Sequence, residues 1–415
     1  MMNILFLSQN SPGFSTLRSD HIREFLHKSK KYTTHEVPLT EQNIYEEQLH
    51  ANLYSLSTFC DAIITAGPFL PALVLPYLNS KTPIWMDWPS DPLADGLSKY
   101  AVQKNINWSD IQNATRKALS RADAFGVISH RSKDALIGQL MLLGRVDQNF
   151  YFEGIHVTPV VCKFPENIYL ASDKDIQNKD TFEILICGSL NTWFNIEELC
   201  KGLESFLSLP NNRRTHIHFV GAQRFCDYSP EGWNILQHWK QKLASDVVTC
   251  HPWLEDEDFE HLLQQCDVGL WMDKVGVEPY LGSRTRALFY AWRGLDIIGG
   301  SSCELAEDLC RHDEMYVAQS ANTLKDQLCH VRSNPIPFTK KRNRLYRLQR
   351  EYGLTRTFDP LEKWLENPRQ RKHFVELLSP QEQISQLQKE LHNVYNSSTW
   401  KILSSIHKRI LKRRQ

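Results

Sequence analysis

The sequence lacks an excess of charge of either sign. Its 415 residues include 48 lysines and arginines and 48 aspartates and glutamates, so the formal net charge is +0. No whole-protein field is available to hold a polyanion, and we expect no nucleic-acid partner. A charged ligand must therefore be recognised by a local group of side chains.

Closely spaced cysteine pairs are also missing. The ten cysteines are scattered, and none forms a CxxC pair. This spacing argues against a disulfide framework and a cysteine zinc site, and favours reduced thiols in a cytoplasmic protein. His216 and His218 alternate along an expected strand, so both rings point to one face. We expect them to pack or face water, with a metal pair as the less favoured alternative, and we predict no metal ligand.

The chain has no long apolar run of the kind that crosses a membrane. Residues 3–7 are too short and lack the basic flank of a signal peptide, so we expect none. Residues 62–80 carry no charge but contain Gly67, Pro68, Pro71 and Pro76, which would break a lipid-exposed helix. A buried strand, a turn and a short helix describe this stretch better.

Short apolar runs alternate with helical patterns along most of the chain, which predicts parallel sheets covered on both faces. The expected strands of a first unit are residues 4–7, 62–64, 83–86 and 124–128, and those of a second unit are residues 182–187, 216–220, 247–250, 268–271 and 297–298. The length suits two such units. We predict a first Rossmann-like domain over 1–165 and a second over 166–335, because the segment near 165–179 is polar and poor in large apolar residues.

The chemistry changes after Pro335. Two helices rich in lysine and arginine are expected over 340–350 and 358–374, within a 336–378 segment that packs back on the domains. The 379–415 tail combines a coiled-coil-like stripe over 383–395 with a basic amphipathic stretch over 400–414. We expect residues 397–415 to contact anionic membrane at the inner face of the plasma membrane; a solvated basic tail is the alternative.

One loop carries most of the expected chemistry. Residues 276–286 form a polar segment that leads into an apolar helix over 287–292. Ser283 or Thr285 can cap that helix, and its free N–H groups suit an anion. Arg284 and Arg286 add donors of the kind that hold phosphates, so this loop predicts a diphosphate site. A capped helix with two surface arginines is the alternative.

This loop and several other segments resemble a bacterial subgroup of retaining GT-B glycosyltransferases, the glycosyltransferase family 4-like group that assembles surface polysaccharides. The segments that carry the resemblance are Gly282–Arg286 with Gly294-Leu295, Arg121–Phe125 with Ser129 and Leu143–Val146, Gly188 with Asn191, Trp193 and Phe194, Phe219–Gly221, Cys266–Gly269 and the tail Ser398–Lys401. The resemblance covers most of residues 1–335. It implies an α/β fold of GT-B architecture, with two facing Rossmann-like domains and a C-terminal helical extension.

The resemblance also implies roles for individual residues. The second domain would bind the nucleotide sugar and the first the acceptor. Glu278 would contact the donor sugar, Gly282 and Ser283 would offer backbone N–H groups, and Arg284 and Arg286 would face the diphosphate. Preorganised donors of this kind stabilise a leaving diphosphate without a metal or other cofactor. The further donor-side candidates are Gly188, Asn191, Trp193, Thr285 and Arg224, the last of which could replace cations that are missing from 188–194.

The first domain offers candidates on the acceptor side. Asp87 and Asp91 follow an expected strand, and one of them could act as a base toward an acceptor hydroxyl; Asp91 before Pro92 could equally start a turn. Gly13, Asp20 and His21 lie in or after the first loop and could touch the acceptor or a phosphate, or serve only as surface or capping residues.

The sequence therefore predicts a glycosyltransferase that moves a sugar from a nucleotide sugar to a glycan or lipid-linked acceptor. Where the family has an acidic residue, this chain has Phe289. This departure favours an alternative, a catalytically inactive homologue that acts as a binding or scaffold subunit of a glycan-assembly complex. A nucleotide-sugar epimerase is a weaker alternative, because no acid–base constellation for it is visible.

Overall fold

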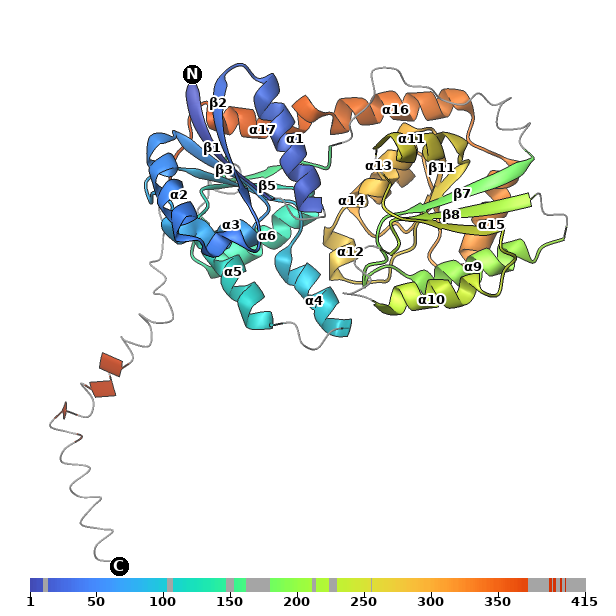
Figure 1. Ribbon diagram of the computed structural model, residues 1–415, viewed down its shortest axis with the longest axis horizontal. Helices are drawn as coiled ribbons and strands as arrows, with labels where there is room; N and C mark the ends of the chain where they lie inside the picture. The colour runs from blue at the N-terminus through green and yellow to red at the C-terminus, as the bar shows by residue number, and fades with distance from the viewer. Residues whose placement is uncertain are drawn as a thin grey trace, which may run out of the picture.

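The structure is a computed structural model of the 415-residue chain. It describes residues 1–9, 14–102, 107–146, 153–161, 180–210, 214–223, 230–254, 256–371, 388–389, 391–392, 396–397 and 400. Two α/β halves, each built on a parallel sheet, lie side by side (Figure 1). Of two C-terminal helices, the first packs on the second half and the next packs on the first half.

The N-terminal half is built on a six-stranded parallel sheet of order β2-β1-β3-β4-β5-β6. Its strands are β1 (Met2–Gln9), β2 (Tyr32–Leu39), β3 (Ala62–Ala66), β4 (Ile84–Trp88), β5 (Ala124–Val127) and β6 (Ile155–Val157). Its helices are α1 (Phe14–Lys28), α2 (Glu47–Phe59), α3 (Phe69–Val74), α4 (Pro92–Val102), α5 (Trp108–Arg121) and α6 (His130–Leu142), with short 3₁₀ turns η1 (Asn43–Tyr45) and η2 (Leu75–Tyr77). Strands β3, β4 and β5 are buried throughout, as continuous apolar runs predict for a sheet covered on both faces.

The C-terminal half repeats this plan with the order β12-β11-β10-β7-β8-β9. Its strands are β7 (Thr181–Cys187), β8 (Arg214–Val220), β9 (Val248–His251), β10 (Val268–Leu270), β11 (Asp296–Gly299) and β12 (Tyr316–Val317). Its helices are α9 (Ile196–Leu207), α10 (Pro230–Lys240), α11 (Asp256–Gln265), α12 (Val277–Leu281), α13 (Thr285–Trp292), α14 (Glu304–Arg311) and α15 (Ala321–Ser333). Figure 1 shows α9, α10 and α15 on one side of the sheet and α11 and α13 on the other.

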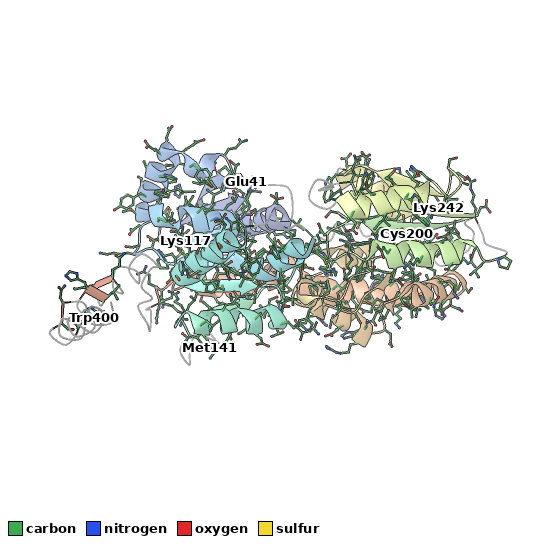
Figure 2. The ribbon with its side chains drawn as sticks, turned by 90° about the horizontal axis from the view of Figure 1, so that it is seen from below. Glu41, Lys117, Met141, Cys200, Lys242 and Trp400 are labelled. Atoms are coloured by element: carbon green, nitrogen blue, oxygen red, sulfur yellow. The ribbon has the colours of Figure 1, made fainter. Side chains whose placement is uncertain are left out.

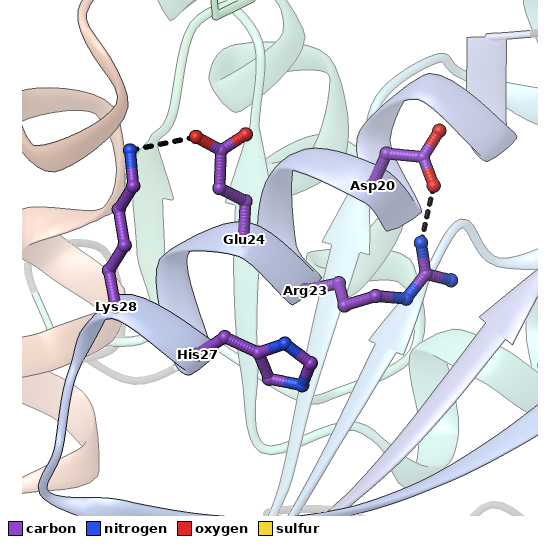
Figure 3. Close-up of a pocket in the computed structure, with 5 residues that line it drawn as sticks. All are labelled: Asp20, Arg23, Glu24, His27 and Lys28. Carbon is purple, nitrogen blue, oxygen red and sulfur yellow. Dashed lines mark hydrogen bonds and ion pairs between the residues drawn. The ribbon is translucent and has the colours of Figure 1, made fainter.

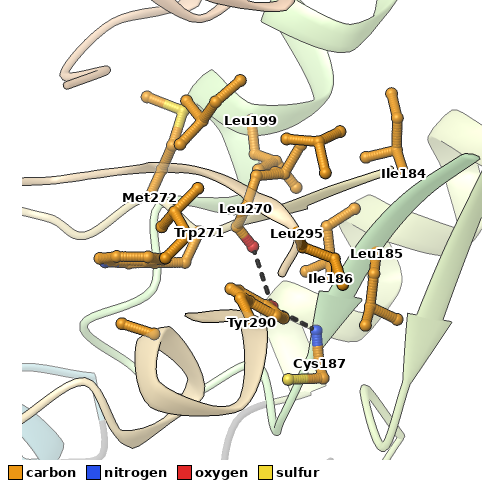
Figure 4. Close-up of a cluster of buried hydrophobic side chains, with 14 of the residues drawn as sticks. Ile184, Leu185, Ile186, Cys187, Leu199, Leu270, Trp271, Met272, Tyr290 and Leu295 are labelled. Carbon is orange, nitrogen blue, oxygen red and sulfur yellow. Dashed lines mark hydrogen bonds between the residues drawn. The ribbon is translucent and has the colours of Figure 1, made fainter. Parts of the chain in front are cut away.

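The core of the C-terminal half is organised around Tyr290. Its hydroxyl accepts a hydrogen bond from the Cys187 backbone N–H at 3.0 Å and donates to the Leu270 carbonyl at 3.3 Å (Figure 4). The ring lies directly over Gly269, where an added Cβ would come within 2.2 Å of it. Helix α13 is thereby held against strands β7 and β10.

The last two described helices join the halves. Helix α16 (Phe338–Tyr352) packs on α13, and α17 (Leu354–Leu365) packs on α1 and β6 of the N-terminal half. Phe358 and Leu361 lie fully buried in a cluster with Phe6 and Trp85. The chain therefore returns to its first half after completing the second.

Secondary structure differs from the sequence-based expectation in a few places. Residues 62–80 form a strand and short helices, as predicted, but β2, β6 and β12 were not expected. Strand β2 is half exposed at a sheet edge and carries polar residues, so it lacks a continuous apolar run. The helix expected over 358–374 begins earlier and ends at Leu365. Most of the 383–395 stripe and of the 400–414 stretch lies outside the described residues; Trp400 lies apart from both halves (Figure 2).

Within the described ranges, no helix combines the length and the apolar character that crossing a bilayer requires.

Candidate functional site

The two halves meet through the loops that follow their strands. Helix α12, which follows β10, contacts α4 and α6 of the N-terminal half. The Ser132 hydroxyl donates to the Leu281 carbonyl at 2.8 Å, and the Arg131 guanidinium lies 4.1 Å from the centre of the Tyr280 ring. The candidate loop over 276–286 is therefore placed at the junction between the two halves.

A second set of contacts closes the same junction. The Glu304 carboxylate accepts hydrogen bonds from the backbone N–H groups of His130 and Arg131, both at 2.9 Å, at the start of α6. Arg131 also pairs with Glu307 at 2.5 Å. An anion at a helix N-terminus is favoured by the helix dipole, so α14 holds α6 electrostatically.

Arg284 lies in a buried ion network. Its Nε donates to Asp273 Oδ2 at 2.8 Å, and its Nη2 donates to Glu278 Oε2 at 3.0 Å. Burial alone would lower the pKa of Arg284, but the carboxylates of Asp273 and Glu278 raise it above its ordinary value. Burial likewise raises the pKa of Glu278, against the opposing effect of Arg284. Arg284 is therefore already engaged by two carboxylates.

Asp273 was not predicted from the sequence as a site residue. Besides binding Arg284, its carboxylate accepts from the Trp271 indole N–H at 3.2 Å and the Ser302 hydroxyl at 3.3 Å. The carboxylate therefore ties Arg284 to the ends of β10 and β11.

Arg286 has a different environment from Arg284. Its Nη1 atom is buried without a hydrogen-bond partner, and among the described residues no carboxylate pairs with it. An added Cβ on Gly188 would lie 3.0 Å from Arg286 Nη2, and the guanidinium carbon lies 5.3 Å from the centre of the Phe194 ring. Gly188 has a φ of 97°, which favours glycine. Arg286 is thus a cation placed over the glycine turn that ends β7.

The start of α13 corrects one prediction. The helix begins at Thr285 with Arg284 in the cap position, and no side chain makes a cap hydrogen bond. The prediction that Ser283 or Thr285 caps the helix is therefore wrong. Gly282 precedes this turn, and its lack of a side chain leaves room for the Glu278 carboxylate, which an added Cβ would approach to 2.7 Å.

The remaining donor-side candidates lie on the loop that follows β7. The Ser189 hydroxyl donates to Asn191 Oδ1 at 3.2 Å, and the Trp193 carbonyl accepts from the Lys274 N–H at 2.7 Å. Arg224 lies outside the described residues. The structure thus brings Gly188, Phe194 and Arg286 together and ties the 188–194 loop to the segment after β10.

Asp87 and Asp91 both have structural partners. Arg18 donates to Asp87 from Nε at 2.9 Å and from Nη2 at 2.5 Å, and both side chains are 0% exposed. Asp91 accepts from the backbone N–H groups of Leu93 and Ala94 at 2.9 and 3.0 Å, so it caps α4. Gln139 also donates to Asp91, at 2.5 Å. Arg18 was missed because its partner lies 69 positions away in the sequence.

The candidates on α1 lie in two environments. Asp20 pairs with Arg23 and lines a surface hollow of about 510 Å³ along α1 (Figure 3). Lys28 and Glu24 form a second ion pair there at 2.8 Å. His21 is buried at 2% exposure. Gly13 lies outside the described residues.

Phe289 lies in an aromatic cluster formed by side chains of α11 and α13. Its ring centre is 6.0 Å from that of Phe259 in an edge-to-face arrangement and 6.5 Å from that of Trp292. The position where the resembling family has an acidic residue is therefore used for packing.

Several solved structures share this architecture. The chain is similar to Anabaena Alr3699/HepE in complex with UDP and glucose, with a TM-score of 0.61 and 15% identity over 88% of this chain and 100% of that one. The fold is GT-B. Sucrose-phosphate synthase from Thermosynechococcus elongatus has a TM-score of 0.61 at 13% identity, covering 88% of this chain and 98% of that one. A trehalose-6-phosphate synthase, studied for glycosyl transfer with retention, has a TM-score of 0.63 at 10% identity, covering 88% of this chain and 99% of that one.

At these identities, the likeness shows the GT-B fold alone. No protein-family model matches the chain, and no curated protein matches it in sequence. The expectation of a GT-B architecture with a C-terminal helical extension is confirmed by the two six-stranded sheets and their structural neighbours.

Proposed function

We propose that this protein transfers a sugar from a nucleoside-diphosphate sugar to a glycan or lipid-linked acceptor. The observation that carries the proposal is Arg286, a cation over the Gly188 turn whose Nη1 has no partner within the described part of the chain. Similar proteins support it, since HepE has been solved with UDP-glucose at a TM-score of 0.60. Arg286 is half-buried, and its inaccessible Nη1 without a hydrogen-bond partner can be satisfied by a bound anion.

In this proposal, the bond between the sugar's anomeric carbon and the diphosphate oxygen breaks as the acceptor oxygen bonds to that carbon, and the acceptor's hydroxyl proton passes to the departing diphosphate. The departing diphosphate gains negative charge, which Arg286 and the N-terminal end of α13 would stabilise without a metal. Glu278 would contact the donor sugar, with its carboxylate oriented by Arg284. Residues 166–335 would hold the donor and residues 1–165 the acceptor, with retention of anomeric configuration.

The test is binding of UDP and a panel of nucleotide sugars, measured by thermal shift and calorimetry. Wild type should be stabilised, and Arg286→Ala should lose about 10- to 150-fold in affinity, the equivalent of a charged hydrogen bond of about 1.5–3 kcal/mol. Arg311→Ala, at a side chain that is 72% exposed, is the matched control. Equal binding by Arg286→Ala would contradict the proposal. If binding depends on Arg286, the nucleotide sugar that binds most tightly is tested in a product assay.

Phe289 favours a second candidate, an inactive GT-B homologue that acts as a scaffold subunit. Its aromatic packing fills a position where the family has a carboxylate. This candidate predicts that no nucleotide stabilises the protein and that no donor is turned over. Contact of residues 397–415 with anionic membrane is a separate proposal, in which deletion of 397–415 abolishes liposome binding and leaves turnover on soluble acceptors intact.

A further inference from the structure

Three side chains with metal-binding atoms converge on one face of the second sheet. Strands β7 and β8 pair in parallel with Glu183 opposite His216, and His218 follows two residues later on the same face. Glu183 Oε2 lies 3.3 Å from His216 Nδ1 and 3.0 Å from His218 Nε2. The sequence showed the histidine pair, but only the strand register brings in the carboxylate.

The other nitrogen of each ring is held by a further residue. His216 Nε2 lies 2.9 Å from the Thr249 hydroxyl, and His218 Nδ1 lies 3.0 Å from His251 Nε2. Thr249 and His251 come from the neighbouring strand β9. Histidines that bind metals almost always use their second ring nitrogen in this way, which fixes the ring orientation.

The spacing suits a small metal ion. Ligand bonds of about 2.0–2.2 Å at tetrahedral angles place ligand atoms roughly 3.3 Å apart. The two oxygen–nitrogen distances of 3.3 and 3.0 Å match this spacing, and all three ligand atoms lie within 4.8 Å of one another. The Glu183 and His216 side chains are 19% and 27% exposed, so an ion and water can enter. We propose that Glu183, His216 and His218 bind a divalent transition-metal ion of the Zn²⁺ type, with Thr249 and His251 as positioning residues.

This site is separate from the proposed glycosyl transfer. Glu183 lies near the start of β7, roughly 16 Å along the strand from the Gly188 turn at the other end. A bound ion links β7 to β8 directly and to β9 through the positioning residues. It therefore stabilises the edge of the second sheet and takes no part in the transfer step.

The experiment uses the full chain, stripped with a chelator and titrated with Zn²⁺ in competition with a chromophoric chelator. We expect one equivalent to bind and to raise the melting temperature. His216→Ala, His218→Ala and Glu183→Gln should each weaken binding by at least tenfold, and Thr249→Val by about 10- to 100-fold. His238→Ala, an exposed histidine on α10, is the control and should bind like wild type. Circular dichroism of each stripped variant confirms that it is folded.

Two further measurements identify the ligands. Co²⁺ in place of Zn²⁺ should give visible absorption bands of a nitrogen- and oxygen-ligated site, absent from the His216→Ala/His218→Ala double variant. Mg²⁺ should not compete, because imidazole suits transition metals and Mg²⁺ prefers oxygen ligands. Absence of Zn²⁺ binding in wild type, or unchanged binding in the folded double variant, would overturn the proposal and leave a hydrogen-bonded histidine cluster.

Discussion

At the residue scale, Arg284 and Arg286 are two positions apart but differ in their ion pairing. Arg284 is 4% exposed and lies against Asp273 and Glu278. Arg286 lies over the Gly188 turn and Phe194. Arg284 is therefore a counter-ion for two buried carboxylates, whereas Arg286 pairs with no carboxylate of the described residues.

This contrast predicts different effects of the two alanine substitutions. Arg284→Ala should lower the free energy of unfolding by about 3–5 kcal/mol, because it leaves two buried carboxylates without their counter-ion. Arg286→Ala should leave that free energy nearly unchanged while it weakens nucleotide binding. Urea denaturation and calorimetry on both variants make the comparison. If Arg284→Ala proves as stable as wild type, the buried network is not balanced as described.

Gly269 is a second residue at which the side chain, here its absence, determines how the core packs. An added Cβ would lie 2.2 Å from the Tyr290 ring, whose hydroxyl is bonded to strands β7 and β10. We expect Gly269→Ala to cost at least about 1–3 kcal/mol of stability, the usual range for overpacking in a core. Gly138→Ala is the control, since nothing lies within 4 Å of its added Cβ in α6. Thermal denaturation should show a loss for Gly269→Ala only; equal melting temperatures would refute the close contact.

At the element scale, α16 is fastened to the second sheet by a buried ion pair. Lys341 Nζ lies 3.2 Å from Asp296 Oδ2, with both side chains nearly inaccessible. Burial lowers the pKa of Lys341 and raises that of Asp296, while each partner opposes the other's shift. The Asp296 carboxylate also accepts from the Ile336 N–H at 3.0 Å. This one carboxylate therefore anchors the segment that leads into α16.

Removing the cation should consequently loosen α16. Lys341→Met should destabilise the protein by about 3–5 kcal/mol, because Asp296 is left buried and unpaired. The exposed neighbour Lys340→Met should change stability by less than about 0.5 kcal/mol. Hydrogen exchange of α16 amides, together with urea denaturation, separates the two. Similar exchange rates in both variants would show that the ion pair does not anchor the helix.

At the scale of the whole molecule, the two halves are joined in two ways. Helices α16 and α17 cross from one half to the other and bury apolar side chains on the first. The loops at the junction meet through polar contacts, among them Glu304 with the start of α6. Polar contacts of this kind exchange readily with water, so we expect the junction to open more easily than the apolar packing of the two helices.

Glu304→Ala should shift the molecule toward an open arrangement. The charge at the α6 N-terminus contributes about 0.3–2 kcal/mol, which corresponds to a change of up to roughly 30-fold in the closed-to-open ratio. Small-angle scattering should show a larger radius of gyration than for wild type or for Glu204→Ala on the exposed face of α9. Superimposable curves for all three proteins would exclude a closing role for Glu304.

The sequence by itself was sufficient for the architecture. Alternation of apolar runs with helical patterns reports burial on two-sided sheets, and parallel strands bring their following loops to one edge. The pattern therefore predicts that the loop over 276–286 and the Gly188 turn lie at one edge of the second sheet, and the structure places Arg286 beside Gly188 there. Strands at sheet edges, such as β2, were not recognisable, because a half-exposed strand carries polar residues.

Only the tertiary structure decided which charged groups pair. Arg18 with Asp87, Arg284 with Asp273 and Lys341 with Asp296 are ion pairs between residues 11 to 69 positions apart, and no periodicity reports them. The same holds for Glu183, which strand register brings to His216 and His218. Local patterns record whether a side chain is buried. The partner that it meets there depends on how distant segments pack, and this partner determines whether a charge stabilises the fold or remains available to a ligand.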